Sequence, residues 1–481
     1  MNFLYATIRL VLLNAAWAFP VLAVGVDTPH VDDQVNKEHE TDPSLAPNLY
    51  VDLKTGSDNN DGRSAPVKTI ARAMKFAKPG DTIHLTSGSY YESADFTNKH
   101  GLPGKPITLD GHGAVLDGSE PVTSDEWELV GPDLYRRQKI YKTTDDAIVS
   151  RWFLLWNGKM QRMNRCSKGP SEDLKKPEEL KPGEWTFVRE DGDAFYLKLE
   201  PGQKLGEANI RYPKRSSAII QSGKGSWLTV KNVTGTHVYN DGFNVHGAQR
   251  NLVFENIAAI ECGDDGFSAH EDADCRIDGF VSIRNATGFC DTGTSQTHYK
   301  NVYIKECTGF DMYFIGLKHS VENALIESSA VRAFWLDGAR LSDGQRCQVT
   351  MKNVHINRVG GGPQELRVGK GGDLYAENCT FQGVNVMLTP KGSVEFQKSV
   401  FKKGKFVPEA QTYRNTIWRG DMNHYDFKLL RVVHEVYTPE TFAEFQKYMG
   451  SDAGSTWSDS QEVSEGTGAD ETSLQKLKPN P

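Results

Sequence analysis

The chain has no surplus of positive charge. Its 481 residues carry 55 Lys and Arg against 63 Asp and Glu, a formal net charge of −8. The excess of acids lies at the two ends, in residues 25–45 and 451–481, and the body between them is neutral by count. Nucleic-acid binding needs clustered basic residues, so nucleic acid is excluded as a partner. The acidic, polar ends are predicted to be a linker (25–45) and a disordered tail (451–481).

Long apolar runs are also missing, with one exception at the start. MNFLYATIRLVLLNAAWAFPVLAVG places one arginine before an apolar run from Leu10 to Val24. The run is short for a membrane span, and its small residues suit a signal peptidase. We predict a signal peptide at residues 1–24, secretion to the periplasm or the extracellular space, and no stable membrane insertion. An uncleaved anchor is the alternative.

Cysteine is scarce and lacks metal-type spacing. The seven cysteines contain no close pair, which argues against a zinc site; they are Cys166, Cys262, Cys275, Cys290, Cys307, Cys347 and Cys379. Because seven is odd, at least one thiol has no disulfide partner within the chain.

What the sequence does contain is a repeat. The pattern apolar, any, apolar, charged, Asn recurs between residues 228 and 398 at intervals of 20 to 29, as LTVKN, LVFEN, VSIRN, VYIKE, ALIES, VTMKN, LYAEN and VEFQK. Each copy alternates with period two, as a strand with one buried face does. Leucine-rich repeats have a helix in each unit, and propeller blades need about 40 residues. The repeat therefore predicts an all-β chain whose main body, residues 219–405, is a right-handed parallel β-helix.

The fifth position of the repeat is most often asparagine. It is occupied by Asn232, Asn256, Asn285, Asn353 and Asn378, and otherwise by Glu306, Ser328 and Lys398. Asparagine tolerates the left-handed backbone of a tight turn, and stacked amides can bond along the axis. In the same alignment Cys262 and Cys290 end corresponding strands about 4.8 Å apart, within the range of a disulfide. We predict either that disulfide or two buried free thiols.

Two similar strings, DGFNVHG (241–247) and DGFSAHE (265–271), lie one coil apart. If Phe243 and Val245 point inward, Asn244 and His246 point outward. Extending this register predicts one outward column of His246, His270, His298, Lys318, Asp337 and Arg367, beside a second of Asn244, Ser268, Gln296, Trp335 and Glu365. Six coils make a stripe of roughly 25 Å, long enough for several sugar rings. The predicted substrate-binding residues are His246, Asn244, Trp335, Asp337 and Arg367. An ordinary solvated face is the alternative.

Carboxylates precede the same strands. Asp241, Asp264 and Asp265 lie at predicted turns, and Asp291 and Asp311 follow in later coils. Asp is also an ordinary turn residue. If they are functional, Asp241, Asp264 and Asp265 could hold Ca²⁺ through oxygen ligands, or two of them could act as acid and base in glycosidic cleavage. No organic cofactor is expected.

Residues 49–93 and the string KPITLDGHGAVLDG (105–118) resemble the opening of secreted bacterial right-handed β-helix proteins of the pectate-lyase-like superfamily. There the segment equivalent to TIARAMKFA is an amphipathic helix that caps the core. The resemblance implies N-terminal coils and this cap over 46–118, and an inserted antiparallel β-rich subdomain over 119–218, where the repeat is interrupted. TPETFAEFQKYM, from Thr438, has an N-cap followed by proline, so residues 406–450 are predicted to cap the other end.

The resemblance also helps to distinguish a polygalacturonase from a polysaccharide lyase. Asn240-Asp241 followed by Gly263-Asp264-Asp265 is similar to the carboxylate strings of family 28 polygalacturonases, but the downstream Gly-His-Gly and Arg-Ile-Lys strings of that family are missing. Polysaccharide lyases of this fold instead pair a base with a group that neutralises a uronate.

We expect first a polysaccharide lyase that cleaves an anionic glycan by β-elimination, with Lys318 or His298 as the base and His270 at the leaving oxygen. One alternative is a glycoside hydrolase that uses Asp241 with Asp264 or Asp265. Another is a non-catalytic glycan-binding or cell-surface solenoid.

Overall fold

The structure is a computed structural model that describes residues 47–342, 344–360, 364–406, 417–432, 434–458, 464 and 466–479. The predicted signal peptide and acidic linker lie outside these residues. No helix in the described ranges is long and apolar enough to cross a membrane. All of the described residues belong to one structural unit, which begins at Pro47.

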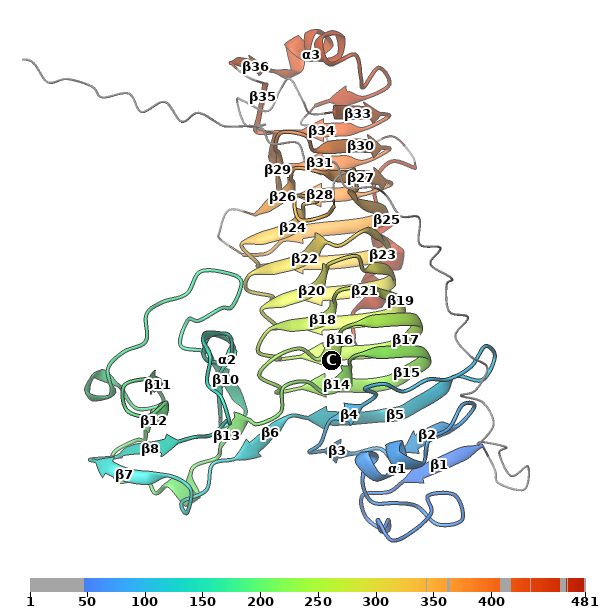
Figure 1. Ribbon diagram of the computed structural model, residues 1–481. Helices are drawn as coiled ribbons and strands as arrows, with labels where there is room; N and C mark the ends of the chain where they lie inside the picture. Colours follow the sequence, from blue (N-terminus) through green and yellow to red (C-terminus); the bar gives the residue numbers. More distant parts are fainter. Residues whose placement is uncertain are drawn as a thin grey trace, which may run out of the picture. The chain divides into compact units, whose positions relative to one another are not determined.

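Two sheets of parallel strands stack coil upon coil along the solenoid (Figure 1). Sheet A consists of β1 (Asn48–Val51), β2 (Thr82–Leu85), β3 (Ser89–Tyr90), β5 (Ile107–Asp117), β15 (Lys224–Thr236), β17 (Ala248–Ile260), β19 (Ala273–Ile283), β21 (Gln296–Lys305), β23 (Lys318–Ser328), β25 (Cys347–Arg358), β27 (Gly372–Glu377), β28 (Thr380–Gln382), β30 (Ser393–Gln397), β31 (Val400–Lys402), β33 (Ile417–Asp421), β34 (His424–Asp426) and β37 (Thr456–Trp457).

Sheet B consists of β4 (Ala94–Asp95), β14 (Ile219–Gln221), β16 (Phe243–Val245), β18 (Asp265–Ala269), β20 (Thr287–Thr292), β22 (Phe310–Ile315), β24 (Arg332–Leu336), β26 (Glu365–Val368), β29 (Asn385–Leu388), β32 (Lys405–Phe406), β35 (Leu429–Val432) and the antiparallel β36 (Glu435–Tyr437). The predicted parallel β-helix is confirmed.

From β15 to β31, sheet A bends in each coil at a residue with left-handed backbone. From coil to coil these residues are Asn232, Asn256, Gly279, Asn301, Asn323, Asn353, Asn378 and Lys398. Some neighbouring amides bond along the axis, for example Asn353 Nδ2 to Asn323 Oδ1 at 2.9 Å. The predicted ladder exists, but Asn285, Glu306 and Ser328 are not members of it. In those coils the sequence pattern matched the part of the strand after the bend, because both parts alternate apolar and polar residues.

Apolar side chains fill the core, and five of the seven thiols lie among them, those of Cys262, Cys275, Cys307, Cys347 and Cys379. All seven cysteines are buried and none forms a disulfide. The predicted disulfide between Cys262 and Cys290 is therefore wrong, and the free-thiol alternative is the one observed. Cys290 lies within β20, in register with Ser268 and Tyr313. Cys262 lies in the turn before β18, so the two residues do not end corresponding strands.

The interruption of the repeat is an insertion with two antiparallel sheets of four strands each. One contains β6 (Ser119–Pro121), β9 (Leu154–Trp156), β10 (Lys159–Gln161) and β13 (Ile210–Pro213), and the other β7 (Glu128–Gly131), β8 (Leu134–Gln138), β11 (Trp185–Val188) and β12 (Ala194–Lys198). Its own core packs Trp152 against Trp185 and Phe195, with ring centroids 4.7 and 4.2 Å apart. Helix α2 (Asp146–Arg151) and the 3₁₀ turns η2 (Pro177–Glu179) and η3 (Leu205–Glu207) complete it.

Helix α1 (Ile70–Phe76) packs on the N-terminal coils. The Thr69 hydroxyl caps it by accepting from the Arg72 N–H at 3.1 Å, and its buried face consists of Ile70, Ala73 and Met74. At the other end η5 (Pro439–Thr441) leads into α3 (Phe442–Met449), which buries Phe442 and Phe445.

The last described segment, residues 466–479, is folded, so the prediction of a disordered tail is wrong there. It contains α4 (Glu471–Leu474) and η6 (Gln475–Leu477). The Gly468 N–H donates to the Lys398 carbonyl at 2.7 Å, and Leu474 is buried against Tyr303 and Leu325. The acidic composition of the tail concealed the few apolar residues that hold it on the solenoid.

Candidate functional site

Three carboxylates from adjacent coils meet on the outer side of sheet B. Asp241 precedes β16, and Asp264 and Asp265 lie at the start of β18. They are only 3 %, 1 % and 1 % exposed, because the insertion covers them. Asp241 accepts hydrogen bonds from the Ser268 hydroxyl at 2.7 Å and from the Asp265 backbone N–H at 3.1 Å. The coil spacing of the two similar strings thus places these carboxylates together.

The insertion supplies two cations to this cluster. Lys168 Nζ lies 2.6 Å from Asp265 Oδ2 and 3.1 Å from Asp264 Oδ1. Arg151 Nη2 lies 2.8 Å from Asp264 Oδ2. The Ser167 hydroxyl also donates to Asp264. Asp264 is therefore the carboxylate with the most partners of opposite charge.

The surroundings separate the proton affinities of the three carboxyl groups. Burial, together with the charge of Asp264, raises the pKa of Asp265 to about 8. The same two causes raise the pKa of Asp241. Burial acts to raise the pKa of Asp264 as well, but Lys168 and Arg151 outweigh it and hold that pKa below its usual value. Carboxyl groups whose environments push their pKa values apart are typical of acid and base pairs.

Two histidines adjoin the carboxylates. The rings of His246 and His270 stack with centroids 4.2 Å apart, and His270 Nδ1 lies 2.9 Å from the Thr292 hydroxyl. Burial, together with His246, lowers the pKa of His270 to about 3, so its ring is neutral near pH 7. One ligand atom each from Asp241, Asp265 and His270 lie within 4.8 Å of one another. These atoms could hold a cation, although Lys168 supplies positive charge at Asp265. Calcium binding by Asp241, Asp264 and Asp265 stays a prediction.

The outward positions of sheet B continue from the cluster as a stripe. Successive strands align Asn244, Ser268, Cys290, Tyr313, Trp335 and Arg367. Two guanidinium groups lie over the Trp335 ring, those of Arg332 and Arg367, at 5.0 and 4.9 Å from its centroid. His246, His270 and Asp337 each follow the last residue of a strand in the same sheet. The structure thus brings Asn244, Trp335 and Arg367 into one column rather than the two predicted.

Other predicted members of the columns lie elsewhere. His298 is on β21 in register with Arg276 and Ser320, and Lys318 is on β23 in register with Gln296 and Gln348, all in sheet A. Their predicted place beside His270 is therefore wrong. The prediction failed because the repeat pattern was aligned on the wrong side of the bend. A strand of sheet A was therefore taken for a strand of sheet B. Glu365 aligns with Arg332 and not with Trp335.

Asp291 and Asp311 do not extend the carboxylate cluster. Both are fully buried, and Asp291 is in register with the core residues Ala269 and Phe314. The Thr297 and Tyr299 hydroxyls donate to its carboxylate at 2.6 and 3.1 Å. Burial raises the pKa of each of the two carboxyls to about 7.

Comparison with solved structures identifies chains of similar architecture. A structure titled as the complex of XylC with xylose aligns over 86 % of both chains, with a TM-score of 0.53 and 12 % sequence identity. This likeness shows that the two chains share a parallel β-helix fold. Pectate lyase Pel9A (15 % identity, 78 % of both chains, TM-score 0.32) and the GH136 lacto-N-biosidase from Eubacterium ramulus (12 % identity, 85 % of this chain and 66 % of that one, TM-score 0.38) are more distant.

Sequence comparison covers only short parts of this β-helix. Residues 54–98 match the family described as protein of unknown function, DUF1565. The uncharacterized protein YwoF of Bacillus subtilis (strain 168) is 31 % identical over 116 residues, which are 23 % of this chain and 24 % of that protein. The match therefore spans about a quarter of the length of this curated relative.

The cations of the site were missed because they come from the insertion of the β-helix. Lys168 and Arg151 lie 97 and 113 residues before the carboxylates that they contact. No repeat or periodic pattern links the two segments. The only available signal was position, since the insertion directly precedes the coils that carry Asp241 and Asp265.

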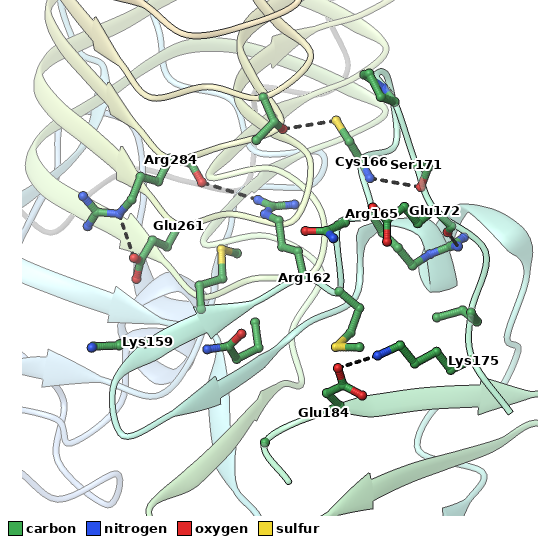
Figure 2. Close-up of a pocket in the computed structure, with 18 of the residues that line it drawn as sticks. Lys159, Arg162, Arg165, Cys166, Ser171, Glu172, Lys175, Glu184, Glu261 and Arg284 are labelled. Atoms are coloured by element: carbon green, nitrogen blue, oxygen red, sulfur yellow. Dashed lines mark hydrogen bonds and ion pairs between the residues drawn. The ribbon is translucent and has the colours of Figure 1, made fainter. Parts of the chain in front are cut away.

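A cavity of about 1210 Å³ separates the insertion from the coils beside this cluster (Figure 2). Its walls include Arg162 and Lys175 from the insertion and Glu261 and Arg284 from the β-helix. Arg162 Nη1 donates to the Gly263 carbonyl at 2.8 Å, immediately before Asp264. Arg284 pairs with Glu261 at 2.8 Å and Lys175 pairs with Glu184. The cavity wall therefore fixes the backbone that presents the carboxylates.

Proposed function

We propose that the protein is a glycan-degrading enzyme and that it hydrolyses glycosidic bonds at Asp241 and Asp265. The observation that supports this most directly is the pairing of two buried carboxyl groups, Asp241 and Asp265, on adjacent coils. Burial and the charge of Asp264 raise the pKa of Asp265, and a carboxyl group with a raised pKa can hold its proton and give it to a leaving oxygen.

The spacing of the carboxylates favours a double displacement. Oxygens of Asp241 and Asp265 lie within 4.8 Å of each other, nearer to the ~5 Å of retaining enzymes than to the wider gap of inverting ones. Asp265 protonates the glycosidic oxygen while an Asp241 oxygen bonds to the anomeric carbon and the bond to the leaving sugar breaks. Asp265 then takes a proton from water, whose oxygen displaces Asp241. The net change is the addition of one water.

The lyase hypothesis loses support from the same geometry. Its predicted bases, Lys318 and His298, lie on sheet A, whereas the carboxylates and His270 lie at sheet B. A base must reach the proton that it abstracts, so residues on different sheets do not form the proposed pair.

The stripe beyond the carboxylates suits an anionic glycan. Tyr313 and Trp335 contribute aromatic rings with centroids 6.4 Å apart, while Arg332 and Arg367 supply positive charge. Substrate entry requires the segment that carries Lys168 to move away from Asp265. Such a substrate agrees with the secreted location that the N-terminal sequence predicts.

The test is a screen of the purified protein on pectin, alginate and sulfated glycans. Reducing ends without absorbance of an unsaturated product support hydrolysis, and absorbance with reducing ends supports a lyase. On a substrate so identified, Asp265→Asn is expected to lower kcat at least 100-fold, because an amide cannot give a proton. Asp272→Asn, at a residue outside the cluster whose side chain is 50 % exposed, is the matched control and should leave kcat unchanged. Full activity of Asp265→Asn would overturn the proposal.

A non-catalytic glycan-binding solenoid is the second candidate. The burial of Asp264 and Asp265 beneath Lys168 and Arg151 favours it, since such ion pairs also fasten an insertion to a scaffold. This candidate predicts glycan binding with neither product in the screen.

A further inference from the structure

A second cluster of metal-type side chains lies on the N-terminal coils, far from the carboxylates in sequence. His84 is on β2, and Asp110 and His112 are on β5, the strand of sheet A that pairs with β2. His84 and Asp110 are register partners across these two strands. The three side chains come together because the strands of neighbouring coils are in register.

The two imidazoles face each other through ring nitrogens. His84 Nδ1 lies 2.9 Å from His112 Nε2, and the rings stack with centroids 5.2 Å apart. His112 Nδ1 lies 3.7 Å from Asp110 Oδ1. One ligand atom from each of the three residues lies within 4.8 Å of the other two.

We propose that His84, His112 and Asp110 bind one divalent transition-metal ion of the Zn²⁺ type. Imidazole nitrogen and carboxylate oxygen are ligands that Zn²⁺ accepts. Two nitrogens on a tetrahedral Zn²⁺ are about 3.3 Å apart, so the imidazoles need to separate by only a few tenths of an ångström. Three protein ligands leave the fourth position to water.

The surroundings orient the ligands as in known metal sites. His84 Nε2 lies 3.2 Å from Asn48 Oδ1, so the ring donates its Nε2–H to the amide and keeps the Nδ1 lone pair free for the ion. Tyr50 stacks on the other side of the His84 ring at 5.4 Å. Asp110 accepts from Asn232 Nδ2 at 2.9 Å, which fixes its carboxylate.

The ligands are also accessible to an ion. The His112 side chain is 49 % exposed. His84 lines a cavity of about 360 Å³ together with Tyr50 and Thr86. Lys231 Nζ lies 3.2 Å from Asp110 Oδ2 and competes with the ion for this carboxylate. Removing that charge is therefore expected to tighten binding.

Calorimetric titration of the full chain with Zn²⁺ tests the site, with Cu²⁺ and electron paramagnetic resonance as a second readout of nitrogen ligands. We expect one ion per chain, binding weakened at least 10-fold by His84→Ala or His112→Ala, about 10-fold by Asn48→Ala, and strengthened by Lys231→Ala. Zn²⁺ should raise the Tm of the wild type more than that of His84→Ala, because it links adjacent coils.

Two matched variants separate this site from other histidines. His100→Ala removes an exposed histidine outside the cluster, and His270→Ala removes the one beside the carboxylates. Both should bind Zn²⁺ with the stoichiometry and affinity of the wild type. Equal binding by the wild type, His84→Ala and His112→Ala, or no binding by the wild type, would overturn the proposal.

Discussion

His237 shows how single residues fasten one coil to the next. Its Nδ1 lies 3.2 Å from Asp117 Oδ2 and its Nε2 lies 3.2 Å from Glu261 Oε2. Burial acts to lower the pKa of this histidine, but the two carboxylates outweigh it and raise the pKa to about 9. The ring is therefore positively charged at neutral pH and bridges carboxylates on both sides.

His237→Asn is expected to lower the free energy of unfolding by about 2 kcal/mol at pH 6. The folded-state pKa is raised, so the stabilisation is fully present below the unfolded pKa of 6.5 and is lost as pH rises through about 9. Urea unfolding at pH 6, 8 and 10 should show the difference between wild type and variant shrinking with pH. His100→Asn, at an exposed ring, is the control. A difference independent of pH would contradict the argument.

At the scale of strands and turns, the sequence predicted the repeating coil, but in some coils it did not predict which residue lies at the bend. Period-two alternation and recurrent asparagine were enough for the fold, since Asn232, Asn256 and Asn353 do occupy the bend. Alternation could not distinguish the two halves of a bent strand, and Gly279 removed the asparagine that marked the bend. This error in the alignment assigned His298 and Lys318 to the wrong sheet.

The candidate site was predictable only where it depends on the repeat. Asp241 and Asp265 occupy equivalent places in consecutive coils, so their proximity followed from the coil length. Lys168 reaches them from an irregular segment whose fold depends on tertiary packing, and single-sequence patterns carry no information on that contact.

The segment that carries Lys168 makes a testable contribution to stability. Lys168→Met keeps the length of the side chain but leaves the ionised Asp264 with less compensating charge, so we expect a loss of about 3 kcal/mol in the free energy of unfolding at pH 7. Adding Asp264→Asn should recover part of the loss in a double-mutant cycle. Lys159→Met, at an exposed lysine, is the control. A loss below about 0.5 kcal/mol would show that the pair contributes little.

For the solenoid as a whole, contacts between distant coils are the exception. Each coil packs on its two neighbours, as in other repeat proteins. Residues 466–479 differ, because they contact Lys398, Asn353 and Leu325 in succession and Lys478 pairs with Glu327 at 2.6 Å. The segment therefore couples coils that otherwise do not touch.

Leu474→Ala is expected to lower the free energy of unfolding by about 2–3 kcal/mol, because it removes the side-chain atoms that pack against Tyr303 and Leu325. Amide hydrogen exchange of β21 and β23 should become faster in the variant. Leu102→Ala, at a residue 46 % exposed, is the control. Unchanged exchange in both strands would show that the segment does not support these coils.

The position of this segment also bears on how the protein is made. Residues 466–479 are translated after every coil that they cover, so Tyr303 and Leu325 remain uncovered on the nascent chain until this segment has been synthesised. A ribosome-bound chain halted near residue 460 would hold assembled coils with an open apolar flank. During this interval the flank is a natural contact for a holding chaperone.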